Sequence, residues 1–100
     1  MKRIVMFVEG RLIGLGFNER NYDIRKCMEY FVENVQEAKV LMTALGKSII
    51  LEYAAMCDKA DIHVFKEENG FSICISGCHI DEKSISGTGT DITATLTVHD

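Results

Sequence analysis

The feature that most constrains the fold is a run of apolar residues that recur every three or four positions between residues 24 and 45. The members of this run are Ile24, Cys27, Met28, Phe31, Val35, Ala38, Met42 and Leu45. This spacing predicts one apolar stripe along a helix of about six turns. Asn18 or Asn21 would supply the N-cap oxygen. Gly46, followed by Lys47, predicts the C-terminal end of the helix.

The residues before this helix, and many of those after it, have the patterns of strands. Five consecutive apolar residues, 4–8, predict a strand that is covered on both faces. From residue 61 the apolar residues alternate with polar ones, and Asn69-Gly70 predicts a two-residue hairpin turn within 61–77, because both central positions need a positive φ.

The C-terminal residues predict two further short strands around a turn at Gly87 and Gly89. In the last strand, Ile92, Ala94, Leu96 and Val98 would face the core, and Thr93, Thr95, Thr97 and His99 would face the other way. Residues 48–53 have apolar side chains on every side, so a strand is favoured there and a short helix is the alternative.

The predicted fold class is therefore α+β, in a single domain covering residues 1–100. It consists of a mainly antiparallel sheet of four to six strands packed against one long helix. A ferredoxin-like plait is the neighbouring alternative. It requires a second helix, for which only residues 48–59 are available.

Composition excludes some classes of partner. The net charge of −4 and the sequence pI of about 5.3 argue against nucleic acid and against acidic membranes. No run reaches the ~18 apolar residues of a membrane span, and the N-terminal run stops at Glu9, short of the ~7–15 residues of a signal peptide. A cytoplasmic location is expected, and with it four reduced cysteines.

Glycines and arginines gather in residues 8–21. A strand, a glycine turn and a helix N-terminus together can present several backbone N–H groups to an anion. The candidate anion-binding residues are Arg11, Gly14, Gly16, Asn18 and Arg20. The structural alternative is a plain strand-to-helix turn.

Residues 8–18, VEGRLIGLGFN, resemble the signature loop of acylphosphatases. The directly matching positions are Gly10, Gly14, Gly16 and Phe17, and Leu12 and Leu15 stand in for valines. The resemblance implies a phosphate-cradling loop and an acylphosphatase-like hydrolase. Ile13 replaces the glutamine of the family pattern, Asn18 replaces the arginine that grips the phosphate, and the asparagine of the second motif has no counterpart after the helix.

Other chemistry-bearing residues do not form a recognisable constellation. Cys74, Cys78 and His79 have a C-x3-C-H spacing, whereas zinc and haem sites use C-x2-C, so packed thiols are expected. Glu67-Glu68 and Asp81-Glu82 are read as solvated turn residues. We therefore expect no catalytic residues, no metal site and no cofactor, although the enzyme question stays open.

The favoured function is a small acidic non-catalytic binding or regulatory module that acts through protein–protein contacts, of the inhibitor, immunity or antitoxin type. Self-association is included, because the threonine-rich C-terminal strand, if it is an edge, would pair with a copy of itself to give a homodimer. The favoured alternative for its threonines is an ordinary solvated face of an antiparallel sheet. The alternative is an acylphosphatase-like enzyme, or a domain binding phosphate or nucleotide with the Gly10–Gly16 loop, in which Arg11 or Arg20 supplies the missing charge.

Overall fold

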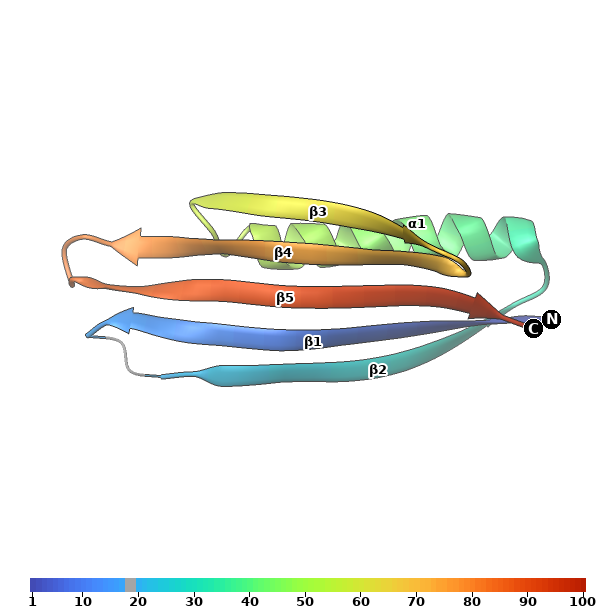
Figure 1. Ribbon diagram of the computed structural model, residues 1–100, viewed down its shortest axis with the longest axis horizontal. Coiled ribbons are helices and arrows are strands. Elements are labelled where there is room, and N and C mark those ends of the chain that lie inside the picture. Colours follow the sequence, from blue (N-terminus) through green and yellow to red (C-terminus); the bar gives the residue numbers. More distant parts are fainter. Residues whose placement is uncertain (18–19) are drawn as a thin grey trace.

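One helix packs on one face of an antiparallel sheet in the computed structural model, which describes residues 1–17 and 20–100 (Figure 1). The sheet has five strands in the order β2-β1-β5-β4-β3. The elements along the chain are β1 (Lys2–Gly16), β2 (Tyr22–Val32), α1 (Val35–Ala54), β3 (Lys59–Glu67), β4 (Gly70–Asp81) and β5 (Ser86–His99). The predicted α+β class is confirmed.

The core lies between α1 and the three inner strands. The strands contribute alternate residues, as a period of two requires. These residues are Ile4, Met6 and Val8 of β1, Ile73 and Ile75 of β4, and Ile92, Ala94 and Leu96 of β5. The predicted facing of the C-terminal strand, with its threonines on the opposite side, agrees with this burial.

Helix α1 begins at a polar cap and buries one stripe. The Asn34 side chain accepts a hydrogen bond from the backbone N–H of Glu37 at 2.9 Å, and the Glu37 carboxylate accepts one from the N–H of Glu33 at 2.8 Å. This arrangement satisfies one backbone donor in the first turn of the helix and one just before it. The buried residues of α1 are Ala38, Met42, Gly46, Ile49 and Tyr53, spaced by three or four positions.

The predicted start and end of the helix were both wrong. Residues 22–32 form β2, and the apolar run continues into the helix only from Val35. Gly46 does not stop the helix, because it lies on the buried stripe and a side chain there would meet the ring of Phe71. Residues 48–53, favoured as a strand, belong to α1 because Ile49 and Tyr53 continue the same stripe. Residues 48–54 complete α1, and residues 55–58 connect it to β3, so this segment forms no second helix. The ferredoxin-like plait is therefore excluded.

The hairpin of β3 and β4 was predicted correctly, but its turn is shifted by one residue. Glu67 pairs with Gly70, so Glu68 and Asn69 are the central residues, and neither has a positive φ. The turn predicted at Gly87 and Gly89 is wrong, since both glycines lie within β5 and the chain reverses at residues 82–85.

Strand β5 is the middle of the sheet, paired with β1 on one side and β4 on the other. The predicted threonine-rich edge is therefore wrong. The two edges are β2 and β3 (Figure 1). Among the described residues, no helix is long and apolar enough to cross a membrane.

Candidate functional site

The glycines of the expected anion site lie in a strand. Gly14 and Gly16 are paired with Thr88 and Ser86 of β5, and Asn18 lies outside the described residues. The predicted strand-to-helix turn is wrong, because β1 is followed by β2, and α1 begins at the opposite end of the sheet from Gly16 (Figure 1). No helix N-terminus is therefore available to an anion beside these glycines.

The structure does not bring the two candidate arginines together. Arg11 projects from β1 on the face opposite α1, where its Nε lies 3.2 Å from Oδ1 of Asp23. Arg20 lines a separate hollow on the helix side, together with Leu12, Tyr22, Met56, His79 and Thr88. Both arginines were expected at one site because they flank the same glycines, but the register of β1 directs Arg11 to the open face, whereas Arg20 lies outside the strands and lines a hollow on the helix side.

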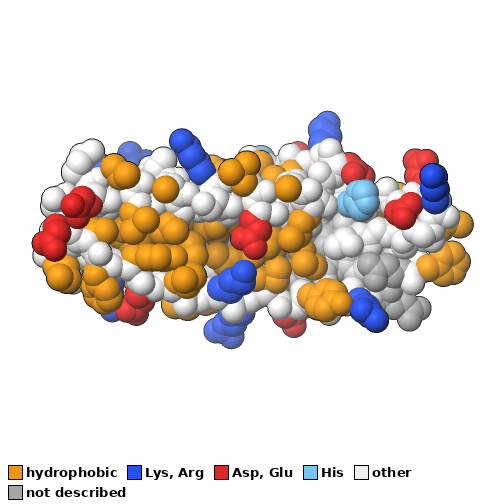
Figure 2. Space-filling view, turned by 180° about the vertical axis from the view of Figure 1, so that it is seen from behind, with side chains coloured by type: hydrophobic (Ala, Val, Ile, Leu, Met, Phe, Trp, Pro, Cys, Tyr) orange, Lys and Arg blue, Asp and Glu red, His pale blue; other side chains and the backbone are white. Residues whose placement is uncertain are grey.

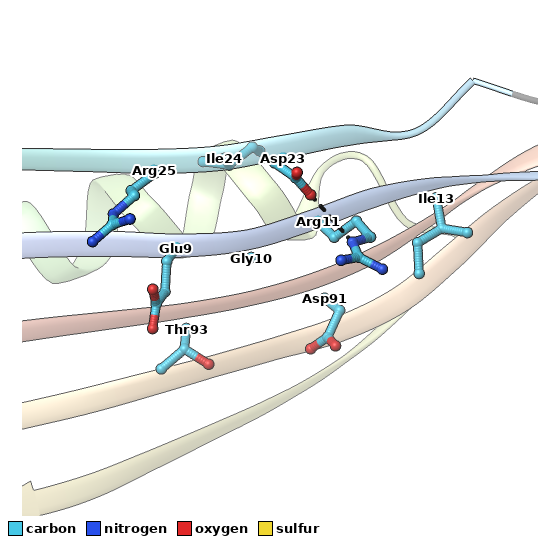
Figure 3. Close-up of a pocket in the computed structure, with 9 residues that line it drawn as sticks. All are labelled: Glu9, Gly10, Arg11, Ile13, Asp23, Ile24, Arg25, Asp91 and Thr93. Atoms are coloured by element: carbon cyan, nitrogen blue, oxygen red, sulfur yellow. Dashed lines mark hydrogen bonds and ion pairs between the residues drawn. The ribbon is translucent and has the colours of Figure 1, made fainter.

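The surroundings of Arg11 have mixed charge. Its hollow on the open face is lined by Glu9, Gly10, Ile13, Asp23, Ile24, Arg25, Asp91 and Thr93 (Figure 3). Three carboxylates in this set oppose two guanidinium groups, and Arg25 lies over the ring of Phe7 at 5.8 Å from its centroid. A cross-strand charge ladder of this kind stabilises a solvated sheet face and offers no surplus positive charge to an anion.

The sequence missed an aspartate–histidine pair beside the Arg20 hollow. Nδ1 of His79 lies 2.8 Å from Oδ1 of Asp58, whose Oδ2 accepts a hydrogen bond from the N–H of Ile80 at 3.0 Å. The hydrogen bond between the His79 ring and the accepting Asp58 carboxylate raises the pKa of His79 and lowers the pKa of Asp58. Asp58 precedes His79 by 21 residues, and only the β3–β4 pairing brings them together.

The four cysteines are free thiols. Cys74 projects from β4 beside the Thr93 hydroxyl at 3.8 Å, and Cys57 follows α1. Cys27 was expected on the buried helix stripe, but it is exposed on β2. Within residues 1–17 and 20–100, no three His, Cys, Asp or Glu side chains come together to hold a metal ion.

A single helix is too narrow to cover this sheet. Five strands span about 19 Å between the outermost strand axes, whereas a helix with its side chains is about 10–12 Å wide. Helix α1 lies behind β3 and β4 in Figure 1, and β2 has no helix behind it. Apolar residues on the helix side of β2 therefore stay partly exposed. We call this group the β2 flank: Ile24, Met28, Tyr30 and Val32.

Hydrophobic side chains gather on this side of the molecule (Figure 2). Met28 is 47% exposed, and on α1 the outward-facing Val40 is 63% exposed. On the other edge, Val64 of β3 is also exposed on this side. A concentration of large apolar side chains on one face is typical of interaction surfaces.

No family model matches this chain, and the comparisons with curated proteins and with solved structures also return no match. The resemblance of residues 8–18 to the acylphosphatase loop stays a prediction. The pairing of Gly14 and Gly16 with β5 does not add support to it.

Proposed function

We propose that this protein is a small non-catalytic binding or regulatory module that acts through protein–protein contacts, in the manner of inhibitor, immunity and antitoxin proteins. The observation that carries the proposal is the β2 flank, an apolar surface beside an edge strand. Both parts suit a protein partner, because side chains supply apolar area and the strand supplies backbone hydrogen bonds.

Burial of exposed apolar side chains contributes favourable free energy to binding. Fully burying one side chain the size of methionine or valine contributes about 1.5–3 kcal/mol. Met28 and Val40 are roughly half or more exposed in the free chain. A partner that covers Met28, together with Tyr30 and Val32, gains that burial without any rearrangement of the fold.

Site-specific photo-crosslinking in host cells tests the proposal. A photoreactive phenylalanine analogue in place of Met28 should give one defined covalent adduct with a polypeptide. The matched control carries the same analogue in place of Glu82, an exposed residue in the β4–β5 turn. The proposal is contradicted if position 28 gives no adduct, or only the same mixture of adducts as position 82.

A second candidate function is the binding of a phosphate-bearing small molecule, and one observation favours it. The hollow of about 280 Å³ beyond the C-terminal end of α1 is lined by a guanidinium, an imidazole and two hydroxyls, from Arg20, His79, Tyr22 and Thr88. The raised pKa of His79 favours its protonated form, which can donate a charge-assisted hydrogen bond to an oxyanion.

Inorganic phosphate and a panel of phosphorylated metabolites test this candidate by thermal shift. A ligand at about 100 times its dissociation constant adds roughly 2.7 kcal/mol to the free energy of unfolding. The shift should be larger at pH 6 than at pH 8.5 and should be absent from Arg20→Ala and His79→Gln variants. No shift with any member of the panel would remove this candidate.

A further inference from the structure

We propose that the partner of β2 is a second copy of this chain. Two β2 strands would pair antiparallel about a two-fold axis at Cys27, joining the two five-stranded sheets into one. This inference rests on the proposed function, since it names the polypeptide that the β2 edge binds.

The register of the sheet fixes which backbone groups of β2 point outward. The N–H of Phe17 donates to the carbonyl of Ile85 on the β5 side, so odd-numbered β1 residues face β5 and even-numbered ones face β2. Because Met6 pairs with Met28, the even-numbered β2 residues face β1. The N–H and C=O groups of Arg25, Cys27 and Glu29 are therefore directed to the outer side, where no other strand of the described residues lies.

An axis at Cys27 matches opposite charges on the open face of the sheet. It places Arg25 of each copy directly opposite Glu29 of the other, which gives two equivalent ion pairs next to the axis. Arg25, Cys27 and Glu29 are the residues whose backbone points outward, so these contacts are also the hydrogen-bonded pairs of the new ladder. Opposite charges in directly facing positions stabilise a pair of strands.

The same register matches apolar residues on the helix side. Ile24 faces Tyr30 of the second copy, and Tyr22 faces Val32. Met28 faces Lys26 of the second copy. Nζ of Lys26 lies 3.9 Å from Oε1 of Glu52 on α1 of its own chain, so the aliphatic part of the lysine side chain is available to pack against the methionine. The pairing therefore covers the outer edge of the β2 flank with the β2 flank of the other copy.

Neighbouring registers are worse. Moving the axis to Lys26 puts Asp23 opposite Glu29, which is a like-charge pair. Moving it to Met28 puts Arg25 opposite Phe31 and Cys27 opposite Glu29, so both ion pairs are lost. Pairing odd-numbered residues of one copy with even-numbered residues of the other is also excluded, because it would join the open face of one sheet to the helix side of the other.

The other edge is a weaker match for self-pairing. Strand β3 has nine residues against eleven in β2. A two-fold register centred on His63 puts Lys59 opposite Glu67, so its ion pairs fall at the ends of the strand. That register also brings two His63 imidazoles together at the axis.

Charge-reversal variants measured by sedimentation velocity test the proposal. The wild-type chain should sediment with twice the chain mass of 11.2 kDa. Arg25→Glu and Glu29→Arg should each weaken dimerisation by about tenfold or more, because two facing pairs become repulsive in each case. The double variant R25E/E29R should recover the dimer, since it restores opposite charges between the copies.

The double variant also separates this pairing from effects within one chain. Arg25 faces Glu9 across β1 and β2, and Glu29 lies 3.9 Å from Arg3. Both intrachain contacts stay mismatched in the double variant, so recovery reports only the contact between copies. A monomer at all concentrations, or a dimer that both single reversals leave unchanged, would overturn the inference.

Cross-linking locates the axis. Directly facing residues of a hydrogen-bonded antiparallel pair have Cα atoms about 5.5 Å apart, within the range that a disulfide spans. Mild oxidation of a Cys78→Ser variant should give a covalent dimer joined through Cys27, and Cys27→Ser should give none. A dimer cross-linked only through other positions would place the interface elsewhere and overturn the inference. A monomer that still forms the Met28 photo-adduct with another protein would overturn this inference alone and leave the proposed function standing.

Discussion

Gly46, in the middle of α1, packs against the ring of Phe71 on β4. A Cβ at residue 46 would lie 3.1 Å from Cε2 of that ring and 3.4 Å from Cδ1 of Ile73. The glycine therefore allows the helix to lie close to the sheet at this point. It explains why a residue that commonly ends helices lies in the interior of this one.

Replacing Gly46 tests this close approach. Glycine-to-alanine in a helix interior adds about 1 kcal/mol of helix propensity, but here the new methyl group must displace Phe71. We expect Gly46→Ala to gain less than that amount. In a Phe71→Leu background the same substitution should be more favourable by about 0.5–1 kcal/mol in a double-mutant cycle followed by urea unfolding. Additive effects of the two substitutions would contradict the contact.

Gly10 is required by the backbone of β1. It has a φ of 155°, and a Cβ there would lie 2.0 Å from the carbonyl oxygen of Asp91. Gly10→Ala should lower the free energy of unfolding by about 2–3 kcal/mol or more, from backbone strain and overpacking. Gly89→Ala is the matched control, because its nearest contact would be an ordinary 3.7 Å from Ile13, and it should be close to neutral. Equal effects at the two glycines would refute this account of β1.

The Asn34 cap should contribute to stability on its own. Asn34→Ala removes the oxygen that accepts from the Glu37 N–H, and such losses cost about 1 kcal/mol. Asn34→Ser keeps a capping oxygen and should retain most of the stability. Thermal unfolding of the three proteins at neutral pH measures both effects, and an alanine variant as stable as the wild type would show that the cap contributes nothing.

The Asp58–His79 pair predicts a pH dependence with a definite sign. The pKa of His79 is raised in the folded chain by its hydrogen bond to the Asp58 carboxylate and by the charge of Asp58, with a smaller contribution from the charge of Asp81. The contribution of His79 to the free energy of unfolding is therefore complete below the ordinary histidine pKa of about 6.5. This contribution disappears as the pH rises through the raised pKa. The pKa of Asp58 is lowered, so its contribution disappears only in acid, as the pH falls through that lowered value.

Urea unfolding of the wild type and His79→Gln across pH 5 to 9 checks this dependence. The stability difference between the two proteins should be largest near pH 5 and should shrink toward pH 9. A difference that is constant over this range, or that grows with pH, would contradict the pairing.

Much of the fold follows from local pattern, but the boundary between β2 and α1 does not. Ile24, Met28 and Val35 fit a spacing of three and four that suits a helix, yet the first two also share one face of a strand. β2 is an edge with partial burial on one side, so its pattern has no clean alternation, and periodicity alone cannot separate the two structures. The Asn34–Glu37 capping pair was the local signal that marked the true start of α1.

The candidate site was less predictable than the fold, because it depends on strand pairing. Arg11 and Arg20 are close in sequence but line different hollows. His79 is far from Arg20 in sequence, and the two residues line the same hollow only because the strands of the sheet pair as they do. The edge position of β2 likewise follows from strand order, which one sequence pattern does not specify. The prediction of an edge that pairs with its own copy was attached to β5, which the structure places at the centre.

Amide hydrogen exchange along β2, resolved by NMR, tests the central claim most directly. The even-numbered amides of Lys26 and Met28 are bonded within the chain and should be protected in any case. If the β2 edge binds a second copy, the outward amides of Arg25, Cys27 and Glu29 should be protected as well, and the Arg25→Glu variant should lose that protection. Rapid exchange of the odd-numbered amides in the wild type, beside slow exchange of the even-numbered ones, would show an unpaired edge and contradict the claim.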